Sequence, residues 1–338
     1  MNKRTPEMLC LLCLKEKATK TNSHFIPVAL LNSNIGPRDY EEAYKVSPSE
    51  EKSLDSFKGR NNLDNNDTEI KQNPYAADYI LCPTCEKELS VWENEMNPIF
   101  SKEIFKDKLN QNFQIKNTLN EVSYLECSKV NTGIFVLYFY SIVWRMCIQY
   151  KLSQEQDFIA PDEIEILRKI IYDNLPYHMQ PKGNIPIDKI PFLISTCLSP
   201  DINRTSNVAL CHPQHENPYC FYINDFIVLI SFLGSESLKN KIGINHPISS
   251  LIINNIRDVV KIGLLKKEGW EARQEDILTK IAKALTERYI LDLSKITGMS
   301  LNDCNNLLHS QSKLINEQSG ISYGEAFVEG FKRITGKT

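Results

Sequence analysis

Cys10-Leu11-Leu12-Cys13 and Cys82-Pro83-Thr84-Cys85 are two Cys-x-x-Cys sequences in a chain of 338 residues. Each pair can place two thiolates on one tetrahedral ion, and four soft sulfur ligands indicate structural zinc. The alternative is that both pairs are small core residues without a metal. A closed four-sulfur site leaves no position for water, so this zinc is expected to organise the fold and not to perform chemistry.

A helix is predicted directly after the second pair. Residues 79–81 predict a short strand that leads into it, Pro83 suits the first turn of a helix, and Pro98 would end it. Apolar residues recur between these prolines at helical spacing: Leu89, Trp92 and Met96. Glu86 and Glu93 lie on another face of the same turns.

The chain is predicted to be α+β with two domains. Residues 1–105 form the zinc-binding domain, in which residues 34–78 have few apolar positions and are expected to be a flexible insertion. Residues 106–338 form an α+β and helical C-terminal domain of unknown role, and residues 102–120 are expected to be partly helical.

In the second domain the pattern changes from helix to strand and back. Residues 133–150 favour a buried helix by length, although their aromatic and branched content also suits a strand. Pro161 begins a helix with a clear apolar stripe. Strands of a small antiparallel sheet are predicted at residues 192–198, 208–211, 219–223 and 226–232. The remainder is predicted to be helical, with a turn at Gly298 and an N-cap at Ser300.

Composition argues against several classes of protein. The chain has 39 basic and 42 acidic residues, so no overall positive field indicates a nucleic-acid partner and any such contact must be local. The N-terminal apolar stretch is too short for a signal peptide, and the run from Ile134 to Trp144 is about half the length that spans a bilayer. A cytoplasmic protein without a membrane partner is expected, in which clustered thiols bind metal.

The motifs together resemble a known family. Cys-x-x-Cys, the segment Ser23-His24-Phe25-Ile26-Pro27, and Leu81-Cys82-Pro83-Thr84-Cys85-Glu86 opening a helix with Trp92-Glu93 resemble the zinc-containing HNH endonucleases, also called His-Me finger enzymes, and a group of uncharacterised bacterial HNH-like proteins. The resemblance covers the first 105 residues by motif and residues 130 to 235 by their general sequence pattern, and the last hundred residues are unmatched. It implies a treble-clef or ββα-metal finger and a DNA nuclease, in bacterial antiviral defence or restriction.

The resemblance also implies roles for single residues. His24 occupies the position of the general base that activates water, and a catalytic Mg²⁺ or Mn²⁺ stabilises the departing oxygen. Glu86 and Glu93 are the candidate ligands for that ion, or else solvated surface charge. The family usually has aspartate where this chain has Ser23 and histidine where it has Glu86, so a non-catalytic zinc module that binds nucleic acid or protein is the alternative.

DNA is the expected partner, RNA is not excluded, and a protein could bind through the C-terminal domain. Residues 239–273 contain several basic side chains that can face phosphate, or form an ordinary solvated surface. The candidates for nucleic-acid contact are Lys261, Lys266 and Lys267.

Overall fold

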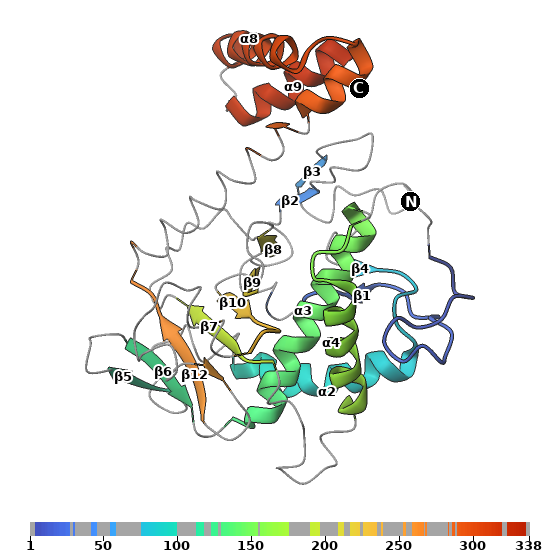
Figure 1. The fold of residues 1–338 in the computed structure, drawn as a ribbon, viewed down its shortest axis with the longest axis vertical. Coiled ribbons are helices and arrows are strands. Elements are labelled where there is room, and N and C mark those ends of the chain that lie inside the picture. Colours follow the sequence, from blue (N-terminus) through green and yellow to red (C-terminus); the bar gives the residue numbers. More distant parts are fainter. Residues whose placement is uncertain are drawn as a thin grey trace. The chain divides into compact units, whose positions relative to one another are not determined.

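The structure is a computed structural model that describes residues 4–27, 30, 42–45, 55–58, 76–99, 113–117, 123–127, 130–154, 156–175, 190–196, 209–212, 217–223, 226–234, 238, 253–254, 259–266, 268, 283, 286–287, 289–319 and 323–335. The described residues form a mixed α+β fold (Figure 1). The chain divides into two compact units, Met1–Glu42 with Phe57–Trp270, and Ala43–Ser56 with Glu271–Thr338.

The cysteine pairs, a small sheet and a helix form what we call the finger, residues 4–27 and 76–99. β1 (Ser23–His24) pairs antiparallel with β4 (Ala76–Ala77), so that His24 lies opposite Ala76. α2 (Pro83–Pro98) follows, with Cys82 as its N-cap and Pro98 as its last residue. Its buried side chains recur every three or four residues, which confirms the predicted helix: Cys85, Leu89, Trp92 and Met96.

α3 (Thr132–Gln154) is the long core helix, so residues 133–150 are helical and not a strand. Asn131 caps it, because its Oδ1 accepts hydrogen bonds from the N–H groups of Gly133 and Ile134 at 3.1 and 3.3 Å. By length and composition the stretch Thr132–Leu152 could cross a membrane, but 83% of it is buried inside the protein. The helix is longer than the apolar run seen in the sequence, and residues 133–147 of it are buried in the protein core.

α4 (Pro161–Asp173) begins at the predicted proline and buries Leu167 and Ile171. α3 packs against both α2 and α4 (Figure 1). The finger and these two helices therefore share one hydrophobic core, which continues into the sheet.

The main sheet has the strand order β5-β6-β12-β7-β10-β9-β8, and β11 pairs with β7. Neighbours are antiparallel except β12 and β7, which are parallel. The bounds are β5 Gln114–Asn117, β6 Ser123–Cys127, β7 Phe192–Thr196, β8 Ala209–His212, β9 Tyr219–Ile223, β10 Phe226–Ile230, β11 Ile253–Asn254 and β12 Val260–Leu264. Phe192 and Phe226 contact the ring of Phe139, which joins the sheet to α3.

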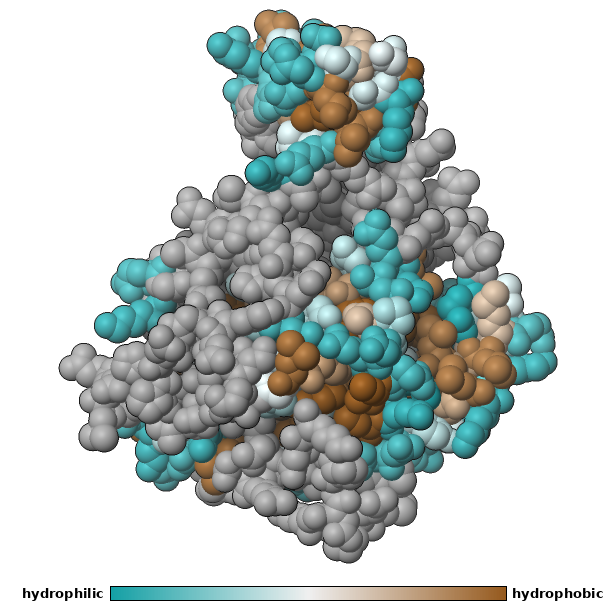
Figure 2. All heavy atoms as spheres, in the orientation of Figure 1, coloured by the Kyte–Doolittle hydropathy of each residue, from teal (hydrophilic) through white to brown (hydrophobic). Residues whose placement is uncertain are grey.

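The described residues between 289 and 335, in the second unit, are mainly helical. A helical segment ends at Thr297, Gly298 follows with φ of 70°, and Ser300 caps α8 (Leu301–Ser319) by accepting the Asp303 N–H at 3.1 Å. This confirms the predicted turn and cap. α9 (Tyr323–Thr335) packs on α8. Figure 2 shows apolar side chains among hydrophilic ones on the surface of this unit, and the exposed apolar residues include Ile296, Leu301 and Leu314.

Several predicted elements differ from the structure. Residues 79–81 bend, with Tyr79 at φ 60°, and the strand lies earlier, at β4. Within residues 102–120, the segment 114–117 is strand β5 and not helix, while 101–112 lie outside the described residues. The remainder after residue 233 is not all helical, since β11 and β12 complete the sheet.

The structure also differs from the sequence prediction in the insertion and in the domain boundary. Within residues 34–78, β2 (Glu42–Lys45) pairs with β3 (Asp55–Lys58), and β4 belongs to the finger; the rest lies outside the described residues. The shared core crosses the predicted boundary at residue 105, because α3 and the sheet pack with the finger. The structure divides the chain near residue 270 instead.

Candidate functional site

Four buried thiols from the two cysteine pairs come together in the finger: Cys10, Cys13, Cys82 and Cys85. Their sulfur atoms all lie within 4.8 Å of one another, and the Sγ atoms of Cys13 and Cys82 are 3.9 Å apart. Tetrahedral zinc with Zn–S bonds of about 2.3 Å separates its sulfurs by about 3.8 Å. The four cysteines could therefore bind a metal such as zinc, as their spacing predicts.

The electrostatics of the cluster favour a cation. A hydrogen bond from the Cys85 thiol lowers the pKa of Cys10 to about 5, while burial raises the pKa of Cys82 to about 12. The pKa of Cys85 is raised, because its proton is held by the Cys10 sulfur and because the site is buried. Without a cation, Cys10 is thus favoured as a thiolate beside the protonated thiols of Cys82 and Cys85. A divalent ion would bind four thiolates and release the remaining protons.

Polar contacts hold the first cysteine pair to its surroundings. Thr84 Oγ1 donates to Glu16 Oε2 at 3.0 Å, which joins the two cysteine pairs outside the cluster. Arg168 of α4 donates to the carbonyl oxygen of Leu12, and Lys15 Nζ donates to the Tyr172 hydroxyl at 3.0 Å. The finger is therefore anchored to α4 independently of the metal.

Ser23, and not His24, is the β1 residue whose side chain meets Glu86. Ser23 is fully buried, and successive strand residues point to opposite faces. Burial raises the pKa of the Glu86 carboxyl, and the Ser23 hydroxyl and the Arg145 guanidinium partly offset this rise. The two groups are neighbours, yet neither Ser23 Oγ nor Glu86 Oε2 has a hydrogen-bond partner of good geometry within the described part of the chain.

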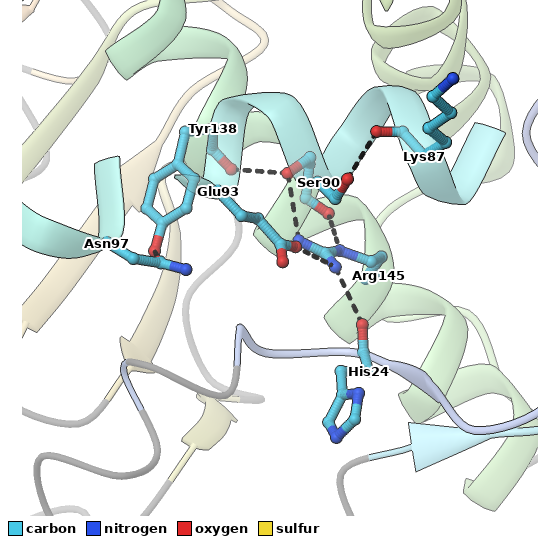
Figure 3. Close-up of polar contacts among 8 residues, drawn as sticks. His24, Lys87, Ser90, Glu93, Asn97, Tyr138 and Arg145 are labelled. Atoms are coloured by element: carbon cyan, nitrogen blue, oxygen red, sulfur yellow. Dashed lines mark hydrogen bonds and ion pairs between the residues drawn. The ribbon is translucent and has the colours of Figure 1, made fainter. Parts of the chain in front are cut away.

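His24 is half-buried, and its ring lies on the other side of the strand. In Figure 3 the imidazole points away from the Glu93 carboxylate, while the main-chain carbonyl of His24 points towards Arg145. Among the described residues, the four cysteines are the group of three or more His, Cys, Asp or Glu side chains whose ligand atoms come together. The structure thus places His24, Glu86 and Glu93 in one finger without gathering them around one point.

Glu93 has a cationic partner from α3. Its Oε1 lies 2.7 Å from Nη1 of Arg145, whose side chain is 3% exposed. Arg145 also donates to the His24 carbonyl at 2.9 Å and to the carbonyl of Ser141 at 3.2 Å. Sequence reasoning treated Glu93 as a metal ligand or surface charge and missed this pair. The signal was present, because a single arginine inside an apolar helix requires a carboxylate.

Two of the lysines predicted to contact nucleic acid, Lys261 and Lys266, lie on or just after strand β12 (Val260–Leu264). Lys261 is half-buried on β12, where it lies opposite Glu126 of β6. Lys266 is exposed just after that strand, and Lys267 lies outside the described residues. A phosphate contact at these positions stays a prediction.

The site thus combines a candidate metal cluster with a half-exposed histidine on a neighbouring strand. A metal bound by four thiolates would hold the finger together. It would not perform chemistry, because no coordination position remains for water. Comparisons of the chain with family models, with curated proteins and with solved structures find no match.

Proposed function

We propose that the chain is an HNH-like, metal-dependent endonuclease that hydrolyses phosphodiester bonds in DNA, with His24 as general base. One observation carries the proposal. The four-cysteine cluster, the paired strands β1 and β4 and the helix α2 lie together, and His24 is the half-exposed residue on β1. This strand–strand–helix order around a thiol cluster is the one that the resemblance to HNH enzymes requires.

In this proposal the residues of the finger have separate tasks. Zinc on the four thiols supplies a fixed fold. His24 takes a proton from the attacking water, and its half-exposed ring allows a phosphodiester to approach. The resemblance assigns to Glu86, which lies on the Ser23 side of β1, the Mg²⁺ or Mn²⁺ that would stabilise charge on the departing oxygen. Bacterial defence or restriction is the setting that the resemblance suggests.

The test is cleavage of supercoiled plasmid by the purified chain with Mg²⁺ or Mn²⁺. His24→Ala is expected to nick at least about 100-fold more slowly, because a general base contributes this much or more. His309→Gln is the matched control, since His309 lies on α8 in the other unit and contacts Phe327. Equal rates of nicking by the wild-type protein and His24→Ala would refute the role of His24 as general base.

A second candidate, a zinc module that binds nucleic acid or protein without cleavage, is favoured by a specific observation. The carboxylate of Glu93 is neutralised by Arg145, and Glu86 meets Ser23 instead of His24. This candidate predicts salt-sensitive gel shifts that persist in His24→Ala and Glu86→Gln, with no nicking by any variant. Metal analysis that finds one zinc and no binding of Mg²⁺ would support it.

A further inference from the structure

Arg145 is a buried charge to which the proposed chemistry assigns no role. Its side chain is 3% exposed inside an apolar helix, and its partner Glu93 is 20% exposed. A guanidinium is retained in such a place only when its charge is paired and its donors are satisfied. The ion pair therefore has a fixed geometry, unlike a pair between two mobile surface side chains.

The other donors of Arg145 connect this ion pair to β1. Nη1 donates to the carbonyl oxygen of His24 at 2.9 Å, and Nε donates to the carbonyl oxygen of Ser141 at 3.2 Å. One planar group thus links β1, α2 and α3, as Figure 3 shows.

β1 is short, so the hydrogen bond from Arg145 contributes to the orientation of this strand. The strand has 2 residues, and within the described chain it pairs with β4 alone. A hydrogen bond to the His24 carbonyl fixes the plane of the peptide between His24 and Phe25. That plane in turn limits the direction of the His24 side chain, which leaves the strand on the side away from Arg145 (Figure 3).

We propose that Arg145 is a positioning residue that, through the main-chain carbonyl of His24, sets the direction of the imidazole. Glu93 is then the counter-ion of Arg145 and not a ligand of a divalent ion. The expected effect of Arg145 on catalysis rests on the proposed function, whereas its effect on the direction of the His24 imidazole does not.

The test uses the full zinc-loaded chain with ¹³C in the carbonyl carbons of His and ¹⁵N in Phe. His24-Phe25 is the one His-Phe step in the sequence, so a spectrum that correlates the two nuclei contains one peak. Arg145→Lys keeps the charge beside Glu93 but removes the planar fork, and is expected to move this peak. Arg168→Lys is the matched control, because Arg168 donates to the carbonyl of Leu12 in the same finger, and it should leave the peak in place.

In plasmid nicking, Arg145→Lys is expected to lower kcat about 100-fold with KM for DNA unchanged, because a misplacement of about 1 Å suffices for such a loss. A moved peak without nicking by any protein, the wild type included, would support positioning and refute the proposed function. An unmoved peak in Arg145→Lys would overturn positioning, whether or not DNA is cleaved.

If Arg145→Lys does not fold, Glu93→Asp carries the same test, because it withdraws the carboxylate and keeps both charges. A moved peak in this variant supports positioning, and an unmoved peak overturns it. Two unfolded variants beside a folded Arg168→Lys would assign the ion pair to stability alone and would also overturn the proposal.

Discussion

Removal of metal from the four-cysteine cluster is expected to lower the stability of the larger unit by an amount that follows from the chain length between the two cysteine pairs. Cys13 and Cys82 are 69 positions apart, and their sulfurs lie 3.9 Å apart. A cross-link that closes a loop of this length removes about 4 kcal/mol of conformational freedom from the unfolded chain. Because the metal also binds the folded chain far better than the unfolded chain, a strong chelator should lower the free energy of unfolding by at least about 4 kcal/mol.

Urea unfolding followed by tryptophan fluorescence measures this loss, because Trp92 and Trp144 are fully buried in the same core. Cys82→Ser should contain no metal and should not respond to the chelator. Cys147→Ser is the matched control, a buried cysteine outside the cluster, and it should respond like the wild-type protein. If the chelator destabilised Cys82→Ser as much as the wild type, or changed neither, the four thiols would not be a metal site.

Two further predictions concern the core around the finger. Burial raises the pKa of Tyr138 well above 10.0, so the folded chain keeps it neutral while the unfolded chain ionises it, and stability falls as pH rises past 10.0. Raising the pH from about 9 to about 11 should therefore cost the wild-type protein about 1.4 kcal/mol more than Tyr138→Phe in urea titrations, and equal losses would contradict this. Glu163 accepts hydrogen bonds from Asn217 Nδ2 at 3.0 Å and the Tyr219 hydroxyl at 2.6 Å, so Glu163→Ala should lose about 1–3 kcal/mol of unfolding free energy. Glu165→Ala, which breaks a more exposed pair with Arg168, should lose less than about 1 kcal/mol, and the reverse order would refute the comparison.

The cysteine spacing predicted a contact between distant parts of the chain because metal chemistry supplies information that local propensity does not. One tetrahedral ion needs both pairs, so the sulfurs of residues 69 positions apart could be expected to meet, and they do. The helix after Cys82 was predictable for a local reason, since Pro83 and the spacing of Leu89, Trp92 and Met96 lie within one element.

The sheet was only partly predictable. Strands β7, β9 and β10 begin where continuous runs of apolar and branched residues begin, at residues 192, 219 and 226. β12 was missed, although Val260, Ile262 and Leu264 alternate with Lys261 and Gly263 in the period-two pattern of a half-buried strand. Its parallel pairing with β7 joins residues far apart in sequence, and no local pattern specifies that choice.

The side of β1 on which each residue lies was the least predictable feature of the site, and it bears most on mechanism. Ser23 and His24 are neighbours in a strand, so once Ser23 is buried against Glu86 the imidazole must leave the strand on the opposite face. A phosphodiester that reaches His24 would approach from that face. Cleavage lost in His24→Ala but kept in Glu86→Gln would therefore show that the ligands of a catalytic ion lie on the His24 side of the strand, whereas loss in both would require the carboxylate behind the strand to act with the histidine in front of it.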